Sequence, residues 1–231
     1  VGGEFLLTTS QMGTNFYMGN GPSANGLYQP LRHARGHPRF ERIDATALAE
    51  RALGRRLSPR EVSNYWMRET WRHVASRPGD WAALLLRKLA LTWNALEVPD
   101  IEDFYFYRQW SPVLRYGAAV WHFGVLMPLA AVGVVLSWNR MRDTWVLLAF
   151  AVVFSLSVAA FYVFGRYRMP LVPMLAPFAA QALVRPVELW RRRRARLLGL
   201  AAALAAVLAA FANIPLNPEQ RTAGLSYYTW G

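Results

Sequence analysis

Two arginines, Arg166 and Arg168, stand between two long apolar runs of the sequence. The run over 144–164, TWVLLAFAVVFSLSVAAFYVF, contains no charged residue, and the run over 169–184 reads MPLVPMLAPFAAQALV. A spanning helix needs about 20 apolar residues, and an arginine at its centre costs about 2.5–3.5 kcal/mol. We therefore expect both arginines, with Tyr167 between them, at a membrane–water boundary, where guanidinium groups can bind phosphate. The alternative is a pair of headgroup anchors that bind no specific ligand.

A second candidate site is acidic. Four of the fourteen acidic residues lie within 97–103, and Glu97 and Asp100 begin this group. Carboxylates this close together can bind a hard cation or act as acid and base. The competing interpretation is a solvated loop that contains a helix cap.

A third candidate is the segment 15–22, NFYMGNGP, which is dense in turn-forming residues. It predicts a loop over 13–28 in which Gly19 and Asn20 adopt left-handed conformations. In such a loop Asn15, Tyr17 and Asn20 could form a polar and aromatic wall for a sugar, and a purely structural loop is the alternative.

Composition excludes several classes of function. The formal charge of +12 would suit a nucleic-acid-binding protein. The arginines, however, are scattered or flank apolar runs, as membrane topology signals do, so no nucleic-acid partner is expected. The chain has no cysteine, which excludes disulfides and thiolate metal ligands. His33 and His37 have a metal-ligand spacing, but the intervening Gly36 argues against the helix that this spacing requires, so no metal is predicted at this pair. No cofactor is predicted for the chain, and the pattern does not define whether a divalent metal is required.

Hydropathy predicts an all-α integral membrane protein with a bundle of about four transmembrane segments. Residues 1–116 form a mostly helical extracytoplasmic region, 117–213 the transmembrane bundle and 214–231 an extracytoplasmic tail. The predicted segments are 117–138, 144–164, 169–184 and 197–212. The third is short and interrupted by prolines, which predicts a bent or partly re-entrant segment.

Orientation follows from the arginines of the short loops. Arginines cluster between the first and second segments, and again between the third and fourth, where 191–194 reads RRRR. The positive-inside rule places both loops in the cytoplasm. Residues 1–116, the Arg166–Arg168 turn and the tail are then on the outer side of a bacterial inner membrane. Because such a chain needs an earlier export signal or span, we expect it to be part of a longer protein.

Helix signals are present within the outer region. Residues 4–9 alternate enough for a short strand, and Asp44 is the expected N-cap of a helix over 44–55. Residues 58–61, SPRE, form a capping box that predicts a helix from Pro59 to about Ser76. A further helix over 81–96, capped by Asp80, is too short and too basic to span. It is expected to lie on the membrane surface.

Together these segments resemble bacterial membrane glycosyltransferases of the GT-C class, the family 39 or dolichyl-phosphate-mannose protein mannosyltransferase-like group. The segments that carry the resemblance are 13–20 with 26–28, then 88–100 from Lys88 to Asp100, and 166–173, RYRMPLVP. The resemblance implies transfer of a sugar from a polyprenyl-phosphate donor to an acceptor on the outer face of the membrane. It also implies that Lys88 joins the two arginines and Tyr167 at the donor phosphate.

The resemblance covers most of residues 1–180, and it places the catalytic carboxylate in an earlier outer loop that no residue here matches. This chain would then be the C-terminal part of the enzyme, and its partners the bilayer, the lipid donor and a preceding transmembrane bundle. Residues 223–231, AGLSYYTWG, resemble the opening of a tetratricopeptide-type helix. A non-catalytic membrane scaffold or a transport subunit is the alternative function.

Overall fold

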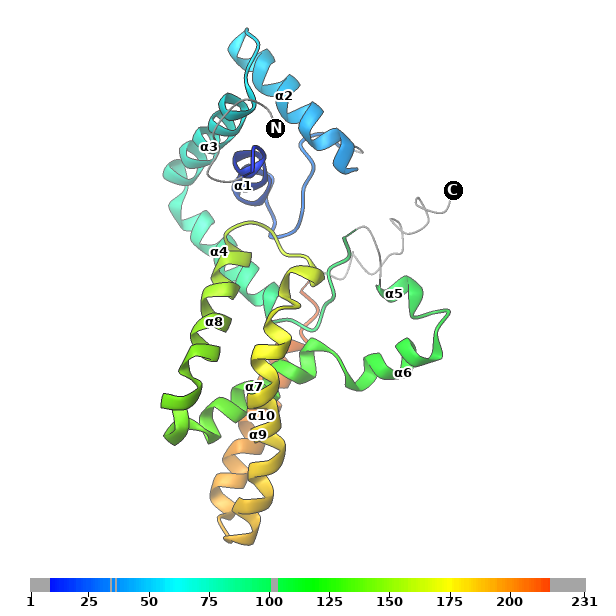
Figure 1. Ribbon diagram of the computed structural model, residues 1–231, viewed down its shortest axis with the longest axis vertical. Helices are drawn as coiled ribbons and strands as arrows, with labels where there is room; N and C mark the ends of the chain where they lie inside the picture. The colour runs from blue at the N-terminus through cyan, green and yellow to red at the C-terminus, as the bar shows by residue number, and fades with distance from the viewer. Residues whose placement is uncertain (1–8, 34, 36, 101–103, 217–231) are drawn as a thin grey trace. The chain divides into compact units, whose positions relative to one another are not determined.

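The described part of the protein is all α-helical. The computed structural model describes residues 9–33, 35, 37–100 and 104–216, and no strand occurs among them (Figure 1). The all-α prediction is therefore confirmed for this part of the chain. The predicted strand over 4–9 falls outside it, Thr9 aside, as does the tail helix over 223–231. Two compact units are present: Val1–Lys88 with Ala159–Val163, and Leu89–Val158 with Phe164–Gly231.

The first unit is built on four helices: α1 (Met12–Asn20), α2 (Pro38–Leu53), α3 (Pro59–Ser76) and most of α4 (Pro78–Thr92). The capping box predicted for α3 is confirmed: Glu61 N donates to Ser58 Oγ, and Ser58 N donates to the Glu61 carboxylate at 2.9 Å. The core contains Ala45, Ala49, Val62 and Trp66. Trp66 Nε1 donates to Ala45 O at 3.1 Å, which ties α3 to α2.

The predicted loop over 13–28 was wrong for residues 13–20, because α1 occupies Met12–Asn20, and it is confirmed for residues 21–28, which are not helical. The glycines of α1 permit close packing instead of turns. A Cβ on Gly13 would lie 1.9 Å from Ser63 O, and one on Gly19 would lie 2.3 Å from Phe161 O. Both positions accept only glycine, because backbone from another segment lies where a side chain would begin.

Two predicted helix starts were also wrong. Helix α2 begins at Pro38 with His37 as its N-cap, and the His37 side chain accepts from Arg39 N at 3.2 Å. Asp44 is buried inside that helix, where it pairs with Arg35 at 3.0 Å. The helix predicted over 81–96 is α4, Pro78–Thr92, so it starts and ends earlier than expected.

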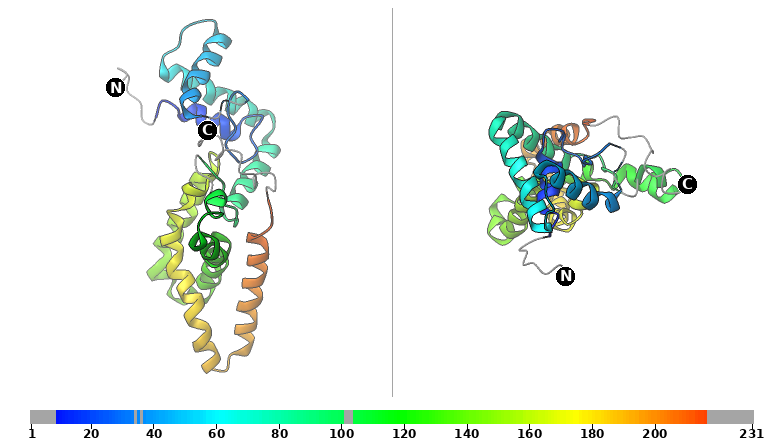
Figure 2. Two further views of the ribbon diagram at one scale, coloured as in Figure 1. Left: turned by 90° about the vertical axis from the view of Figure 1, so that its right-hand side faces the viewer. Right: turned by 90° about the horizontal axis from the view of Figure 1, so that it is seen from above.

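The second unit contains the remaining helices. They are α5 (Phe104–Tyr107), α6 (Pro112–Val120), α7 (Phe123–Leu136), α8 (Met141–Ala159), α9 (Leu171–Arg191) and α10 (Ala195–Ala212), with short 3-10 turns η1 (Trp138–Arg140) and η2 (Gly165–Arg168). Helices α9 and α10 form an antiparallel pair and α7 packs against both (Figure 2). Their shared core includes Phe123, Leu171, Leu175 and Phe178. A Cβ on Gly133 of α7 would lie 1.7 Å from Phe178 O, so α7 and α9 approach each other closely at this glycine.

Three helical stretches of the described residues are long and apolar enough to cross a membrane: Pro112–Leu136, Arg142–Ala159 and Ala195–Ala212. The first comprises α6 and α7, the second lies in α8 and the third is α10. The predicted segment over 144–164 ends early, because residues 160–164 are not helical. The predicted segment over 169–184 belongs to α9, which runs on to Arg191 and remains helical through Pro177 and Pro186.

Candidate functional site

The turn that carries the two arginines, η2, is fixed to the segment after α4. Gly165 N donates to Val98 O at 2.9 Å. A Cβ on Gly165 would lie 2.7 Å from Glu97 Oε2, so this close approach requires glycine. The turn and the acidic segment, about 70 residues apart in sequence, are therefore neighbours within the second unit.

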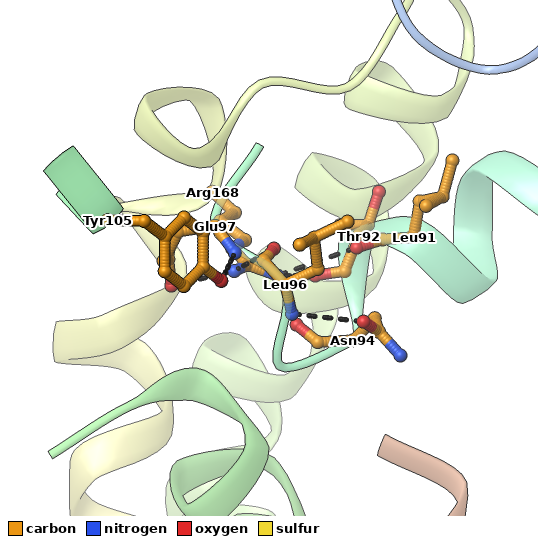
Figure 3. A network of polar contacts seen from close by, with 7 residues as sticks. All are labelled: Leu91, Thr92, Asn94, Leu96, Glu97, Tyr105 and Arg168. Atoms are coloured by element: carbon orange, nitrogen blue, oxygen red, sulfur yellow. Dashed lines mark hydrogen bonds and ion pairs between the residues drawn. The ribbon is translucent and has the colours of Figure 1, made fainter. Parts of the chain in front are cut away.

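Arg168 is the centre of a buried polar network (Figure 3). Its side chain is 1% exposed, and its Nη2 lies 2.7 Å from both Leu96 O and Glu97 Oε1. Its Nη1 donates to Asn94 O, and to Leu91 O and Thr92 O at 3.4 and 3.3 Å. The last carbonyl groups of a helix have no partner within it, so a guanidinium is well suited to the end of α4. Glu97 neutralises the buried charge.

The segment 94–97 that surrounds Arg168 is itself held by hydrogen bonds. Asn94 Oδ1 accepts from Leu96 N at 2.9 Å, and Asn94 Nδ2 donates to Ile214 O at 2.9 Å. Glu97 N donates to the Tyr105 hydroxyl at 3.0 Å. The Arg168 guanidinium also lies 4.6 Å from the centre of the Phe123 ring. This network fixes the position of the Arg168 side chain.

Arg166 differs from Arg168 in exposure. Its side chain is 59% exposed, and its Nη1 pairs with Asp100 Oδ2 at 2.7 Å. Its guanidinium carbon lies 5.2 Å from the Tyr167 ring centre and 5.9 Å from that of Phe164. Arg166 therefore presents a solvent-accessible cation with an acidic neighbour and two aromatic neighbours.

The first unit holds a second polar cluster, centred on Asn20 of α1. Its Oδ1 accepts from Lys88 Nζ at 2.8 Å and from Trp81 Nε1 at 3.0 Å. Its Nδ2 donates to Phe16 O at 3.0 Å and to Ala160 O at 2.8 Å. Lys88 is fully buried, and this burial lowers its pKa to about 7. The cluster therefore contains an amine that titrates near neutral pH.

The three residues predicted to form a sugar-binding wall lie on one helix but in different surroundings. The Tyr17 ring packs on Trp66 with centroids 4.6 Å apart, and burial, followed by the charge of Glu69, raises its pKa. Asn20 belongs to the lysine cluster, whereas Asn15 lines a pocket on the first unit. The structure does not bring the three together, because α1 directs them to different neighbours.

The acidic pair is engaged by arginines in this structure: Glu97 pairs with Arg168 and Asp100 with Arg166. Within the described residues, no group of three or more His, Asp or Glu side chains could hold a metal ion. Sequence reasoning missed Trp81 and Tyr105 as members of these clusters. Tyr105 belongs to an aromatic run typical of a membrane interface, and nothing in the pattern distinguished its hydroxyl from its neighbours.

Comparisons of the chain with protein-family models, curated proteins and solved structures found no match. A function is therefore inferred from the two clusters and from the sequence motifs that they connect.

Proposed function

We propose that this chain is the C-terminal part of a bacterial membrane glycosyltransferase that uses a polyprenyl-phosphate-linked sugar donor on the outer face of the membrane. The observation that carries the proposal is the pairing of Arg166 with Asp100 and of Arg168 with Glu97. These contacts join two of the three segments on which the resemblance rests. The segment over 13–20 also contacts the segment over 88–100, because Asn20 Oδ1 accepts from Lys88 Nζ.

The two arginines have different roles in this proposal. Arg166 is accessible, and a planar guanidinium is a good bidentate partner for phosphate. Tyr167 lies against it and supplies an aromatic surface. Arg168 acts as a positioning residue, because its buried guanidinium binds the end of α4 and holds the turn from which Arg166 projects. Lys88 belongs to the other unit, and its part in donor binding stays a prediction.

The proposal includes four membrane segments, which are the three candidate spans and α9. Residues 1–116 are proposed to lie on the outer side of the membrane. Helix α9 has 21 residues, but only the 14 residues 171–184 precede its first charged side chain, Arg185, and they extend about 21 Å, so α9 is proposed to enter the membrane as a short, partly re-entrant segment. Helix α4 has 15 residues, about 22 Å, which is too short to span and suits a position along the membrane surface. The catalytic base would come from the preceding part of the enzyme.

The transport alternative receives less support from the spans. Transporters usually place strongly polar groups near the membrane centre. The two serines of α8 use their hydroxyl groups locally: Ser155 donates to Ala151 O and Ser157 to Phe154 O, both at 2.7 Å. Both hydroxyl protons are used within α8, so these serines offer little for a solute.

The decisive experiment measures lipid binding. The chain is reconstituted in nanodiscs that contain about 1% undecaprenyl phosphate, and retained lipid is quantified by native mass spectrometry. Loss of a charge-assisted hydrogen bond should make Arg166→Ala bind about 10- to 100-fold more weakly, and Arg166→Lys should recover part of the loss. Arg115→Ala, an exposed arginine of α6, is the matched control.

A second set of nanodiscs carries phosphatidylglycerol at the same charge density. Specific donor binding requires that undecaprenyl phosphate be retained in preference to phosphatidylglycerol. Equal retention of the two lipids, or unchanged retention in Arg166→Ala, would reduce the turn to a headgroup anchor and favour the scaffold alternative.

A further inference from the structure

The connection between α9 and α10 carries a dense group of positive charges. Six arginines lie within 185–196, and Glu188 is the only acidic residue over 171–212. Arg185 pairs with Glu188 at 2.5 Å. The other five arginines are exposed and take part in no ion pair among the described residues: Arg191, Arg192, Arg193, Arg194 and Arg196. We call residues 191–196 the arginine tip, and its charge is uncompensated.

Arg193 has an unusual backbone conformation. Its φ is 52°, and it is the only residue other than glycine with a positive φ in the part of the chain that the structure describes. Arg193 N donates to Trp190 O at 2.8 Å, and Arg194 N donates to Leu189 O at 2.9 Å. These two bonds form the motif that ends many helices at a left-handed residue, which is usually glycine. Helix α2 of the same chain ends in this way at Gly54, with φ 67°.

The arginine at position 193 has a conformational cost that a glycine would not have. A Cβ disfavours left-handed backbone, so the turn would form more easily with glycine. Strain of this kind persists at sites that a function constrains. A membrane topology signal needs only positive charge near the loop, and the neighbouring arginines provide it without a strained backbone. The arginine at 193 therefore indicates that its side chain has a binding partner.

The surroundings of the arginine tip indicate which partner this is. The tip lies at the free end of the α9–α10 hairpin (Figure 2), directly before α10, which is long and apolar enough to cross a membrane. Trp190 is 75% exposed, and tryptophan is enriched where a membrane meets water. On α10, Leu197 and Leu200 are 42% and 67% exposed. Exposed cations therefore lie between an exposed aromatic ring and an apolar surface.

We propose that the arginine tip binds the phosphate groups of anionic phospholipids in the leaflet at this end of the hairpin. A guanidinium can bind phosphate through two parallel hydrogen bonds, and clusters of arginine beside a spanning helix attract anionic headgroups. The Trp190 ring lies at headgroup depth beside them. This inference does not rest on the proposed transferase function, because it uses no residue of η2 or of the segment 94–100.

The same surroundings disfavour other partners of negative charge. An acidic protein segment or a nucleic acid would satisfy the arginines, but neither would cover the exposed Trp190 and Leu200 with hydrocarbon. A zwitterionic phospholipid has a phosphate but no net charge, so it gains little from a group of uncompensated cations. Anionic phospholipids meet both requirements.

The test uses the whole chain in a neutral detergent. Phosphatidylglycerol and phosphatidylcholine with the same acyl chains are titrated separately, and bound lipid is quantified by native mass spectrometry. We expect tighter binding of phosphatidylglycerol. Each arginine near a charged lipid surface contributes enough for about a fivefold change in affinity. Arg193→Gly should therefore weaken phosphatidylglycerol binding about fivefold, and combined replacement of Arg191, Arg192 and Arg194 by Gln about 100-fold.

Stability separates a binding role of Arg193 from a structural one. Because glycine suits the left-handed turn, Arg193→Gly should raise the unfolding temperature in lipid-free detergent by about 2–4 °C while it weakens lipid binding. Arg51→Gln is the matched control, since Arg51 is an exposed arginine of α2 without an ion pair in the described residues. Its lipid affinity should equal that of the wild type.

Three outcomes would overturn the proposal. The first is equal affinity of the wild type for the two lipids. The second is unchanged phosphatidylglycerol affinity in both Arg193→Gly and the triple variant. The third is binding of polyglutamate, titrated in the same way, that is tighter than binding of phosphatidylglycerol, which would assign the arginine tip to an acidic protein partner.

Discussion

Glu97 and Arg168 form an ion pair of 2.7 Å in which the arginine side chain is 1% exposed and the carboxylate 28% exposed. The same guanidinium donates to the carbonyl groups at the end of α4, so one side chain connects η2, α4 and the acidic segment. Removing one partner of a buried pair costs more than the pair itself contributes, because the remaining charge has no compensation.

Arg168→Ala should destabilise the second unit strongly. The substitution leaves the Glu97 carboxylate and the carbonyl oxygens of Thr92 and Leu96 without their partner, and the expected loss is about 3–5 kcal/mol. Arg168→Lys should lose less, since it keeps the charge but not the planar fork that reaches several acceptors. Thermal unfolding in detergent, followed by tryptophan fluorescence, measures both variants.

Arg166→Ala is the matched control for that measurement. The Arg166 side chain is 59% exposed, and exposed ion pairs contribute about 0–1 kcal/mol. The unfolding temperature of Arg166→Ala should therefore stay close to that of the wild type. If the two alanine variants unfold alike, the buried network does not hold η2 in place.

Gly133→Ala should separate α7 from α9. The new methyl group would lie 1.7 Å from Phe178 O, which is a backbone atom that cannot rotate away. Overpacking of a core costs about 1–3 kcal/mol, and a clash with backbone belongs at the upper end. Gly199→Ala on α10 provides the control, because no atom lies within 4 Å of the added Cβ. At Gly199 the higher helix propensity of alanine should raise the free energy of unfolding by up to about 1 kcal/mol. Equal changes in the free energy of unfolding for Gly133→Ala and Gly199→Ala would contradict the close packing of α7 against α9.

Local signals were sufficient for parts of the fold. The start of α3 was predictable because Ser58, Pro59 and Glu61 define the helix N-terminus without help from distant residues. Helix α1 was not predictable in this way. Gly13 and Gly19 resemble turn residues in the sequence, and only the proximity of Ser63 and Phe161 shows that they permit packing.

The role of Arg168 was missed for a related reason. A helix extending to residue 96 would have used the carbonyl groups of Leu91 and Thr92 within itself. Because α4 ends at Thr92, these groups become acceptors for a distant arginine. The sequence indicated that Arg166 and Arg168 are unusual in their apolar surroundings. It could not show that Arg168 is buried and Arg166 exposed, because this difference depends on tertiary contacts.

The proposed orientation can be tested with introduced cysteines, since the natural chain has none. Cysteines at Arg142 and Arg193 should resist a membrane-impermeant maleimide added to intact cells, because both loops are proposed to be cytoplasmic. A cysteine at Ala52 in α2 should react from outside, and all three should react after permeabilisation. Labelling of position 142 or 193 in intact cells would contradict the proposed topology.

Lys88 should make the stability of the first unit depend on pH. It lies on α4, outside the candidate spans, and burial lowers its pKa from 10.5 to about 7. Between these values the unfolded chain binds a proton that the folded chain does not, so the free energy of unfolding should rise from pH 7 to about pH 10. Below pH 7 Lys88 is protonated in the folded and the unfolded chain, so the free energy of unfolding is lowered by the full cost of burying its charge. Lys88→Met should remove this slope and preserve the bond between Trp81 and Asn20, whereas Arg87→Met should keep the slope. Unfolding curves of the three proteins at several pH values give the comparison, and parallel curves for wild type and Lys88→Met would show that Lys88 stays charged when buried.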